Sequence, residues 1–278
     1  MLNLIIHNQS EEQKQAVEGI MKSKESVLNE AKAGEKCYAD SQGWLDTEEW
    51  ADDAKLKHLE EFAKEIRANA DAFVLIGVGG SNNAARSVVE ALREDGAPEI
   101  IYAGNTLSPD ALNRMMKKLE GKSIYIDCIA KNFETLEPGS SFRILRQYME
   151  KTYGEEAHKR IIATGTIGSS LEELCTKYGY TFLEFPLNVG GRYTAMTNVG
   201  LLPMAVAGID IRALVQGAKD MQKRVHEESA ENFPGCALCR TAHRDLRVPV
   251  AENPSSEGRL CDRAAQNGHT EAVRGRHG

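Results

Sequence analysis

The chain has 278 residues, of which 41% are hydrophobic, and this is enough to bury the core of one large or two modest domains. Its formal net charge of −7 at pH 7 argues against a nucleic-acid-binding surface, which needs clustered lysine and arginine. No apolar run approaches the roughly 20 residues that a membrane span requires, so we expect no membrane partner.

The chain begins with MLNLIIHNQSEEQKQ, an apolar run without the basic segment and small-residue cleavage site of a signal peptide. We therefore expect a cytoplasmic protein whose six cysteines are reduced thiols. Apolar residues at helical spacing, clearest between Leu56 and Ile66, predict a helical N-terminal region over residues 1–70 that covers a sheet edge. A loop is expected at 40–46, where Gly43 and several acidic residues interrupt the pattern.

From residue 72 onward, short apolar and partly β-branched runs alternate with helical patterns. The predicted strands cover 73–77, 100–104, 123–129, 160–164 and 181–185, and the predicted helices cover 82–93, 109–119, 138–151 and 169–178. This alternation predicts an α/β domain over residues 71–225, a doubly wound and mostly parallel sheet with helices on both faces. Ligands of such sheets bind at the carboxyl ends of the strands, so the loops there are the candidate sites.

The first candidate loop is GVGGSNNAAR, residues 77–86, between a predicted strand and a predicted helix. Gly80 permits close approach of a ligand, and Ser81 is predicted as the helix N-cap, with its hydroxyl beside unpaired amides that can bind an anion. A dinucleotide fingerprint fails because Asn82 occupies its third glycine position, and no G-K-[ST] of a P-loop follows. A plain capped turn from strand to helix is the alternative interpretation.

The second candidate loop is IAKNFETLEP, residues 129–138. Lys131 can supply a positive charge to a phosphate, and Thr135 can supply a hydroxyl near the start of the next helix. Glu134 and Glu137 favour the helix dipole but repel an anion, so helix capping alone is the alternative function of this segment.

The third candidate segment is NVGGRYTAMTNVGLLP, residues 188–203. Gly190 and Gly191 permit an unusual backbone, from which Arg192 projects a permanent charge that can stabilise an enolate-like oxyanion. A surface arginine in an ion pair is the alternative.

The order, spacing and content of these three segments resemble the phosphoglucose isomerase (glucose-6-phosphate isomerase) family, whose domains have the sugar-isomerase (SIS) fold. The likeness covers about residues 40–230 and is most specific at the Gly-Gly-Arg-Tyr sequence. The resemblance implies an intramolecular oxidoreductase of glycolysis and gluconeogenesis that interconverts glucose 6-phosphate and fructose 6-phosphate. It also implies that full-length members form homo-oligomers, with a small-molecule sugar phosphate as substrate and no redox cofactor or required metal.

The resemblance also assigns roles to single residues of this chain. It implies that Gly80 and Ser81 contact the sugar phosphate and that Lys131 and Thr135 complete the phosphate site. Arg192 is implied to stabilise the enediolate that forms while the proton moves between C1 and C2.

The chain departs from the family pattern in the same loops. The family often has serine at the position of Ala130, serine or threonine at Asn132 and Glu134, and glycine at Ala84. Phosphate-binding hydroxyls are thus missing and a negative charge is added. The sequence is compatible with more backbone contacts to the phosphate or with weaker affinity, and it does not decide between them.

The character of the chain changes near residue 233. Residues 1–232 contain 17 Lys and 10 Arg, whereas residues 233–278 contain no Lys and 7 Arg. The family's catalytic glutamate base, ring-opening histidine and late lysine have no matching position in this chain. We therefore expect a truncated isomerase that lacks its base, with a disordered or aberrant, frameshifted tail at 233–278. A zinc site is the less favoured alternative, with the potential ligands Cys236, Cys239, His243 and Cys261.

Two functions remain open from the sequence. One is an isomerase by family, of uncertain activity in this chain, and the other is a non-catalytic sugar-phosphate-binding SIS module. Three other groups are weaker candidates for a base: His158 is expected to be solvated in a charged helix end, Glu172 lies on a helix face, and Glu137 caps a helix.

Overall fold

The computed structural model describes residues 10–23, 25–33 and 42–227. The chain divides into two compact units, one of residues 41–220 and one of residues 1–40 with 221–278. The predicted tail at 233–278 and the potential zinc ligands in it lie outside the described residues. In the described part, no helix is long and apolar enough to cross a membrane, and no three His, Cys, Asp or Glu side chains gather as a metal site.

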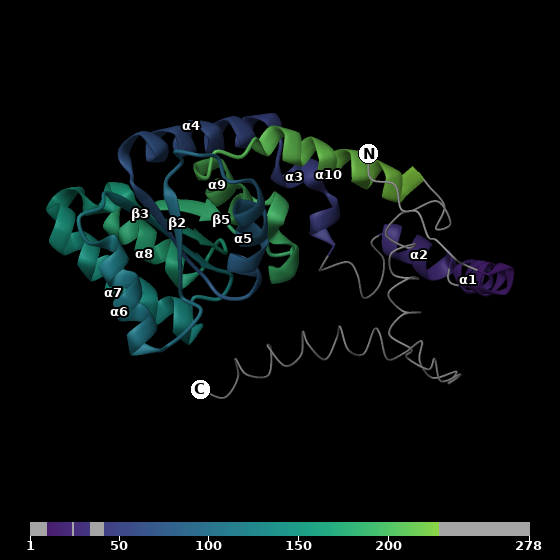
Figure 1. The fold of residues 1–278 in the computed structure, drawn as a ribbon, viewed down its shortest axis with the longest axis horizontal. Coiled ribbons are helices and arrows are strands. Elements are labelled where there is room, and N and C mark those ends of the chain that lie inside the picture. Colours follow the sequence, from purple (N-terminus) through teal and green to yellow (C-terminus); the bar gives the residue numbers. More distant parts are fainter. Residues whose placement is uncertain (1–9, 24, 34–41, 228–278) are drawn as a thin grey trace. The chain divides into compact units, whose positions relative to one another are not determined.

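The unit of residues 41–220 contains a five-stranded parallel sheet (Figure 1). Its strands are β1 (Ala72–Ile76), β2 (Glu99–Ala103), β3 (Ile124–Ala130), β4 (Ile161–Gly165) and β5 (Thr181–Glu184). They lie in the order β2-β1-β3-β4-β5, with Ala72 opposite Glu99 on one side and Ile124 on the other. The predicted doubly wound α/β fold is confirmed, and each predicted strand lies within one or two residues of an observed one.

Helices cover both faces of the sheet. Successive side chains of a strand point to opposite faces, and apolar side chains on both faces must be buried. Phe73 and Leu75 of β1 belong to the core on one face, whereas Val74 and Ile76 belong to the core on the other. The first core is shared with α4 (Asp53–Asn69), α5 (Gly80–Leu92), α9 (Asn198–Val206) and the start of α10 (Ile211–Glu227). The second is shared with α6 (Pro109–Leu119), α7 (Leu136–Tyr153) and α8 (Ser170–Tyr178).

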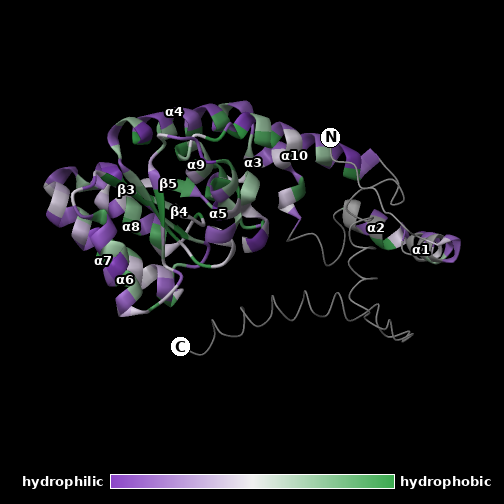
Figure 2. Ribbon diagram, in the orientation of Figure 1, coloured by the Kyte–Doolittle hydropathy of each residue, from purple (hydrophilic) through white to green (hydrophobic). Residues whose placement is uncertain are grey.

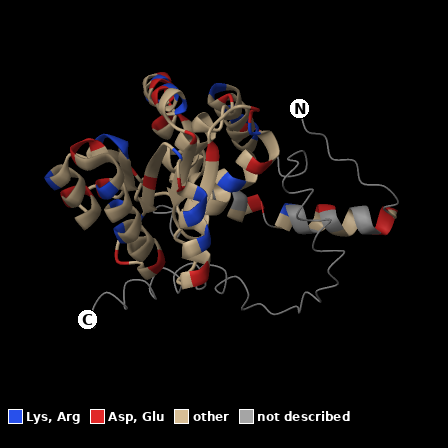
Figure 3. Ribbon diagram, turned by 60° about the vertical axis from the view of Figure 1, so that its left-hand side comes forward, with Lys and Arg blue, Asp and Glu red and all other residues tan. Residues whose placement is uncertain are grey.

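The apolar strands at the centre and the polar outer surfaces of the helices stand out in Figure 2. Each large apolar side chain that becomes fully buried, such as Phe73 or Leu75, stabilises the fold by about 1.5–3 kcal/mol. Charged residues of both signs lie mostly on the helices (Figure 3).

Helix α4 was expected to cover a sheet edge, and the structure corrects this expectation. Its N-cap is Asp52, whose carboxylate accepts a hydrogen bond from the amide of Lys55, and its buried side chains include Leu59 and Ile66. These side chains share the core with Phe73, so α4 lies over a face of the sheet together with α9.

The remaining described elements are short or lie in the other unit. They are α1 (Glu11–Ser23), α2 (Glu25–Lys32), η2 (Gly43–Leu45), α3 (Thr47–Trp50), η3 (Gly154–Arg160) and η4 (Gly191–Met196). The loop predicted at 40–46 is described from residue 42 and contains the short η2 turn. The proposed domain bounds at 70 and 225 stay predictions.

Candidate functional site

The loops that follow β1 and β2 meet the start of α7 at the carboxyl edge of the sheet. The amide of Gly77 donates to the carbonyl of Ala103 at 3.0 Å. Gly104 has a φ of +78°, and a Cβ there would lie 2.9 Å from the Gly77 nitrogen and 3.1 Å from the Pro138 Cα. Only glycine allows this approach, so Gly104 brings the first and second candidate loops together.

The first and third candidate segments are in direct backbone contact. A Cβ on Gly80 would lie 1.6 Å from the carbonyl oxygen of Gly191 and 2.8 Å from the nitrogen of Arg192. The hydroxyl of Thr194, which is fully buried, lies 3.4 Å from the Gly80 oxygen and 3.2 Å from the Gly191 oxygen. The turn that carries Arg192 is therefore held against the start of α5.

The N-terminus of α5 differs from the sequence prediction. The N-cap is Gly79, with a φ of +59°, and Ser81 lies in the first helical turn, so the prediction that Ser81 is the N-cap is wrong. The amides of Asn82 and Asn83 both donate to the carbonyl of Gly79, whereas those of Gly80 and Ser81 have no hydrogen-bond acceptor in the described chain. Two unpaired amides at a helix N-terminus favour an anion.

Lys131 ties the second candidate loop to the third. Its ammonium donates to the carbonyls of Leu187 at 2.9 Å and Val189 at 3.0 Å. Its own carbonyl accepts a hydrogen bond from the Thr166 hydroxyl at 3.0 Å, which adds the loop after β4 to the same edge. The positive charge of Lys131 thus lies within the group of loops that the sequence singled out.

Thr135 is the N-cap of α7, but its hydroxyl does not cap the helix. It donates instead to the carbonyl of Asn132 at 3.0 Å, and the Asn132 side-chain oxygen accepts from the Glu134 amide. Glu137 lies in the first turn of α7, where its charge favours the helix dipole as expected.

Arg192 is exposed and forms no ion pair within the described part of the chain. The next residue, Tyr193, stacks on Trp44 with ring centroids 5.2 Å apart. The amide of Gly43 donates to the carbonyl of Asn188 at 3.0 Å. The η2 turn therefore packs against the segment that carries Arg192, a contact that sequence reasoning did not foresee.

Two of the acid–base candidates have other partners. Glu172 accepts a hydrogen bond from the Gly168 amide at 2.6 Å and so caps the start of α8. His158 lies 2.6 Å from the carbonyl of Glu155, just before β4 and hence at the opposite edge of the sheet. Sequence reasoning missed Thr194 and Thr166, because a single threonine in a loop carries no signal before the loops are brought together.

A buried carboxylate, that of Asp127, lies in the middle of β3, on the N-terminal side of the loops that form the candidate site. The hydroxyl of Thr164 lies 3.1 and 3.3 Å from the two carboxylate oxygens of Asp127, and both residues are fully buried. Burial raises the pKa of Asp127 to about 7, and the Thr164 hydrogen bond lowers it only partly. Asp127 was not among the predicted site residues.

Comparison with known proteins identifies the family. Residues 53–239, about two thirds of the chain, match the family model of phosphoglucose isomerase, and the match runs past the change of composition near residue 233. Glucose-6-phosphate isomerase of Symbiobacterium thermophilum is 43% identical over 204 residues, which are 69% of this chain and 46% of that protein. The enzyme of Staphylococcus saprophyticus is 38% identical over 214 residues, 74% of this chain and 48% of that protein.

Solved structures agree on the fold. A hypothetical protein of Thermus thermophilus superposes with a TM-score of 0.73 at 24% identity, covering 84% of this chain and 57% of that chain. A glucose-6-phosphate isomerase of Chlamydia trachomatis gives a TM-score of 0.59 at 19% identity, covering 68% and 37%. The chain spans about half the length of the curated relatives it matches. By the match of its sequence over most of the described residues, the chain belongs to the phosphoglucose isomerase family.

Proposed function

We propose that this chain forms the sugar-phosphate-binding half of an aldose–ketose isomerase that interconverts glucose 6-phosphate and fructose 6-phosphate through an enediol. The contact between Gly80 and Gly191 carries the proposal, since it holds the start of α5 against the turn that bears Arg192. Unpaired amides and a guanidinium then lie close enough to act on one small anionic substrate.

Each candidate residue has a role in this proposal. The amides of Gly80 and Ser81, with the Ser81 hydroxyl, bind the phosphate at the positive end of the α5 dipole. Lys131 adds charge, and Thr135 adds a hydroxyl at the start of α7. Arg192 stabilises the negative charge of the enediolate, which is absent from the substrate and so favours the transition state.

The reaction also needs a base near C1 and C2. We propose that this chain lacks that base and therefore turns over poorly or not at all. We also propose that the chain after residue 232 is a frameshifted or otherwise aberrant end. Translation of the gene in its other two frames beyond codon 232 tests this idea, and it is wrong if neither frame restores family sequence.

Two measurements on the full chain test the proposed function. Binding of glucitol 6-phosphate, which has the phosphate and hydroxyls of the substrate but no carbonyl, is expected to be saturable by calorimetry and lost in Lys131→Met. Turnover of glucose 6-phosphate in a coupled assay is expected to be near background. Absence of glucitol 6-phosphate binding contradicts the proposed phosphate site. Robust turnover contradicts the proposal that this chain lacks its base.

A non-catalytic sugar-phosphate-binding SIS module is the second candidate. The exposed Arg192, which has no ion pair in the described part of the chain, favours the enzyme, because a module that only binds the phosphate has no need of a cation for an enediolate. The two functions differ in ligand preference. A module binds glucitol 6-phosphate as tightly as an anionic enediolate analogue, and an isomerase site prefers the analogue.

We also propose that the full-length protein forms homo-oligomers, as the family resemblance implies, and that this chain associates with itself through the carboxyl edge of the sheet. A large apolar residue is exposed shortly after every strand, and we name these five the apolar rim: Val78, Leu107, Leu136, Ile167 and Leu187. Their side chains are 38–68% exposed. Exposed apolar side chains at one edge of a sheet are typical of a surface that another protein covers.

A further inference from the structure

Arg192 lies in a turn that has few side chains of its own to hold it in place. The two residues before it are Gly190 and Gly191, and a Cβ on Gly191 would meet no atom within 4 Å. Glycine has more backbone conformations to lose on folding than any other residue. The direction in which Arg192 projects therefore depends on the contacts that neighbouring elements make with this turn.

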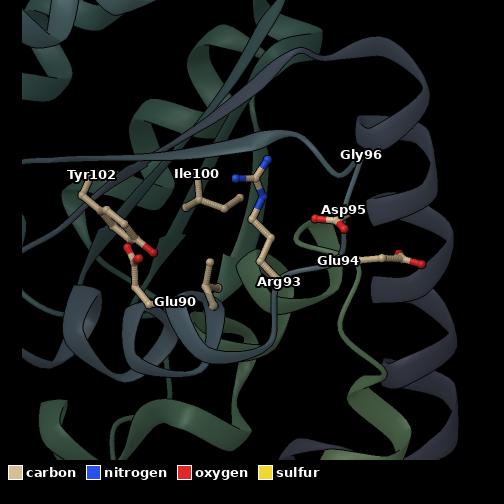
Figure 4. A pocket seen from close by; sticks show the side chains of 8 residues that line it. Glu90, Arg93, Glu94, Asp95, Gly96, Ile100 and Tyr102 are labelled. Atoms are coloured by element: carbon tan, nitrogen blue, oxygen red, sulfur yellow. The ribbon is translucent and has the colours of Figure 1, made fainter.

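One side of the turn lies on α5, a helix that is itself tied down at both ends. The start of α5 touches the turn through Gly80. At the far end, which Figure 4 shows, the Arg93 guanidinium donates to the Ala97 carbonyl at 2.7 Å. Glu94 pairs there with Arg67 of α4 at 2.7 Å. Helix α5 is thus anchored to α4 and to the loop before β2, and it is a fixed reference for the turn.

The other side of the turn is covered by η2. Gln42 pairs with Val189 in an antiparallel bridge. The amide of Gly43 donates to the Asn188 carbonyl at 3.0 Å, and the indole nitrogen of Trp50 donates to the Gly43 carbonyl at 3.0 Å. The η2 turn is therefore bound on one side to the segment before the two glycines and on the other side to α3.

A stacked pair of aromatic rings extends this contact to the neighbour of Arg192. The rings of Trp44 and Tyr193 have centroids 5.2 Å apart and an angle of 17° between their planes. The Tyr193 ring also lies beside Gly190, where a Cβ would be 3.3 Å from it. Trp44 is 40% exposed and Tyr193 is 54% exposed, so the pair lies outside both cores of the sheet. The stack instead restrains the residue that directly follows Arg192.

We propose that Trp44 is a positioning residue for Arg192, an inference that rests on the proposed isomerase function. Trp44 acts through the ring of Tyr193 and holds the turn in the conformation that directs the guanidinium toward a substrate at the start of α5. A cation that is oriented before the substrate binds stabilises the developing charge without first being ordered. Without the stack, the turn is ordered only on binding, and the lost conformational freedom lowers the affinity.

Amide relaxation of the ¹⁵N-labelled full chain tests the positioning without any ligand. In Trp44→Ala, the order parameters of the Gly191 and Arg192 amides are expected to fall by at least about 0.1 from the value of about 0.85 that is typical of rigid backbone. Trp44→Phe keeps a ring for the stack and is expected to retain the original values. Unchanged order parameters in Trp44→Ala overturn the proposal.

Tyr178→Ala is the matched control. Tyr178 is 40% exposed, as Trp44 is, and it stacks on Tyr180 with centroids 5.7 Å apart. It ends α8 and so lies at the amino end of β5, at the opposite edge of the sheet. Its loss removes a comparable stack and is expected to change neither the two amides nor the affinity for any sugar phosphate.

Ligand affinities, measured by calorimetry, test the consequence of the positioning. Trp44→Ala is expected to weaken binding of a sugar-phosphate hydroxamate about three- to tenfold, the range of one aromatic stack, and to change the affinity for glucitol 6-phosphate less than about twofold. Trp44→Phe is expected to bind both ligands as the original chain does. An equal loss for both ligands overturns the proposal, because it indicates disruption of the whole site.

Failure of the proposed function is distinguishable from failure of this inference. An original chain that binds the hydroxamate no better than glucitol 6-phosphate contradicts the isomerase function. The relaxation measurement then still decides whether Trp44 positions the Arg192 turn, since it needs no ligand.

Discussion

The backbone of Gly80 lies against that of Gly191 so closely that a Cβ on Gly80 would be 1.6 Å from the Gly191 carbonyl oxygen. The contact is one-sided, because a Cβ on Gly191 would meet no atom within 4 Å. Gly80 therefore sets the spacing between the first turn of α5 and the turn that bears Arg192. A methyl group on Gly191, by contrast, would point into open space.

Gly80→Ala is accordingly expected to lower the free energy of unfolding by about 1–3 kcal/mol or more, since two backbone segments must move apart to admit the methyl group. The same movement displaces Arg192 from the start of α5 and weakens sugar-phosphate binding. Gly191→Ala is the matched control and is expected to change stability by less than about 1 kcal/mol. Urea denaturation of both variants measures the difference, and equal costs contradict the one-sided contact.

This contact also marks the limit of sequence reasoning. The strands were predictable because continuous apolar runs such as residues 73–77 report burial on both faces. Which glycine makes a tertiary contact has no local signal. Ser81 was assigned as the N-cap from residue preference alone, and the structure gives that position to Gly79, whose φ of +59° starts the helix earlier. Only the folded backbone decides between such neighbours.

Helix α9 was missed for a related physical reason. The sequence analysis predicts an unusual backbone at Gly190 and Gly191 and no helix in residues 188–203, whereas the second half of this segment forms the start of a buried helix that contains Pro203. A helix that is apolar on all sides has no amphipathic period to detect. The phosphate loops were predictable because glycine, lysine and threonine follow strands at an edge where parallel sheets bind ligands.

Arg192→Ala is expected to separate recognition of the enediolate from recognition of the phosphate. Affinity for a sugar-phosphate hydroxamate, whose planar anionic head resembles the enediolate, should fall at least about tenfold. Affinity for glucitol 6-phosphate should fall much less. Arg143→Ala removes another exposed arginine, from α7, that has no ion pair in the described part of the chain, and it is expected to change neither affinity. Equal losses for both ligands would assign Arg192 to the phosphate.

The apolar rim predicts concentration-dependent self-association of the full chain. Leu187→Asp, at a side chain that is 68% exposed, and Ile167→Asp, at one that is 58% exposed, are expected to shift the chain toward the monomer in light scattering after gel filtration. Ile144→Asp, on α7 and 38% exposed, is the control and should leave the mass unchanged. A chain that stays monomeric at high concentration contradicts assembly through the rim.

Asp127 predicts a pH dependence of stability with a definite sign. Its pKa is raised to about 7 in the fold, against a value near 3.8 when unfolded, so the folded chain binds the extra proton between these values. The stability that this proton confers is complete below about pH 4, falls as the pH rises through 7, and is absent above that. The full change is on the order of 4 kcal/mol.

Asp127→Asn isolates this contribution, because asparagine keeps the shape and a hydrogen-bond acceptor for Thr164 without a charge to bury. The variant is expected to be about as stable as the original chain near pH 4 and more stable by a few kcal/mol at about pH 8. Urea denaturation at both pH values measures this difference. Thr164→Val should act in the opposite direction at the higher pH, since it leaves the buried carboxylate without its donor. A difference between the original chain and Asp127→Asn that is the same at both pH values means that Asp127 does not change its protonation state in the fold over this range.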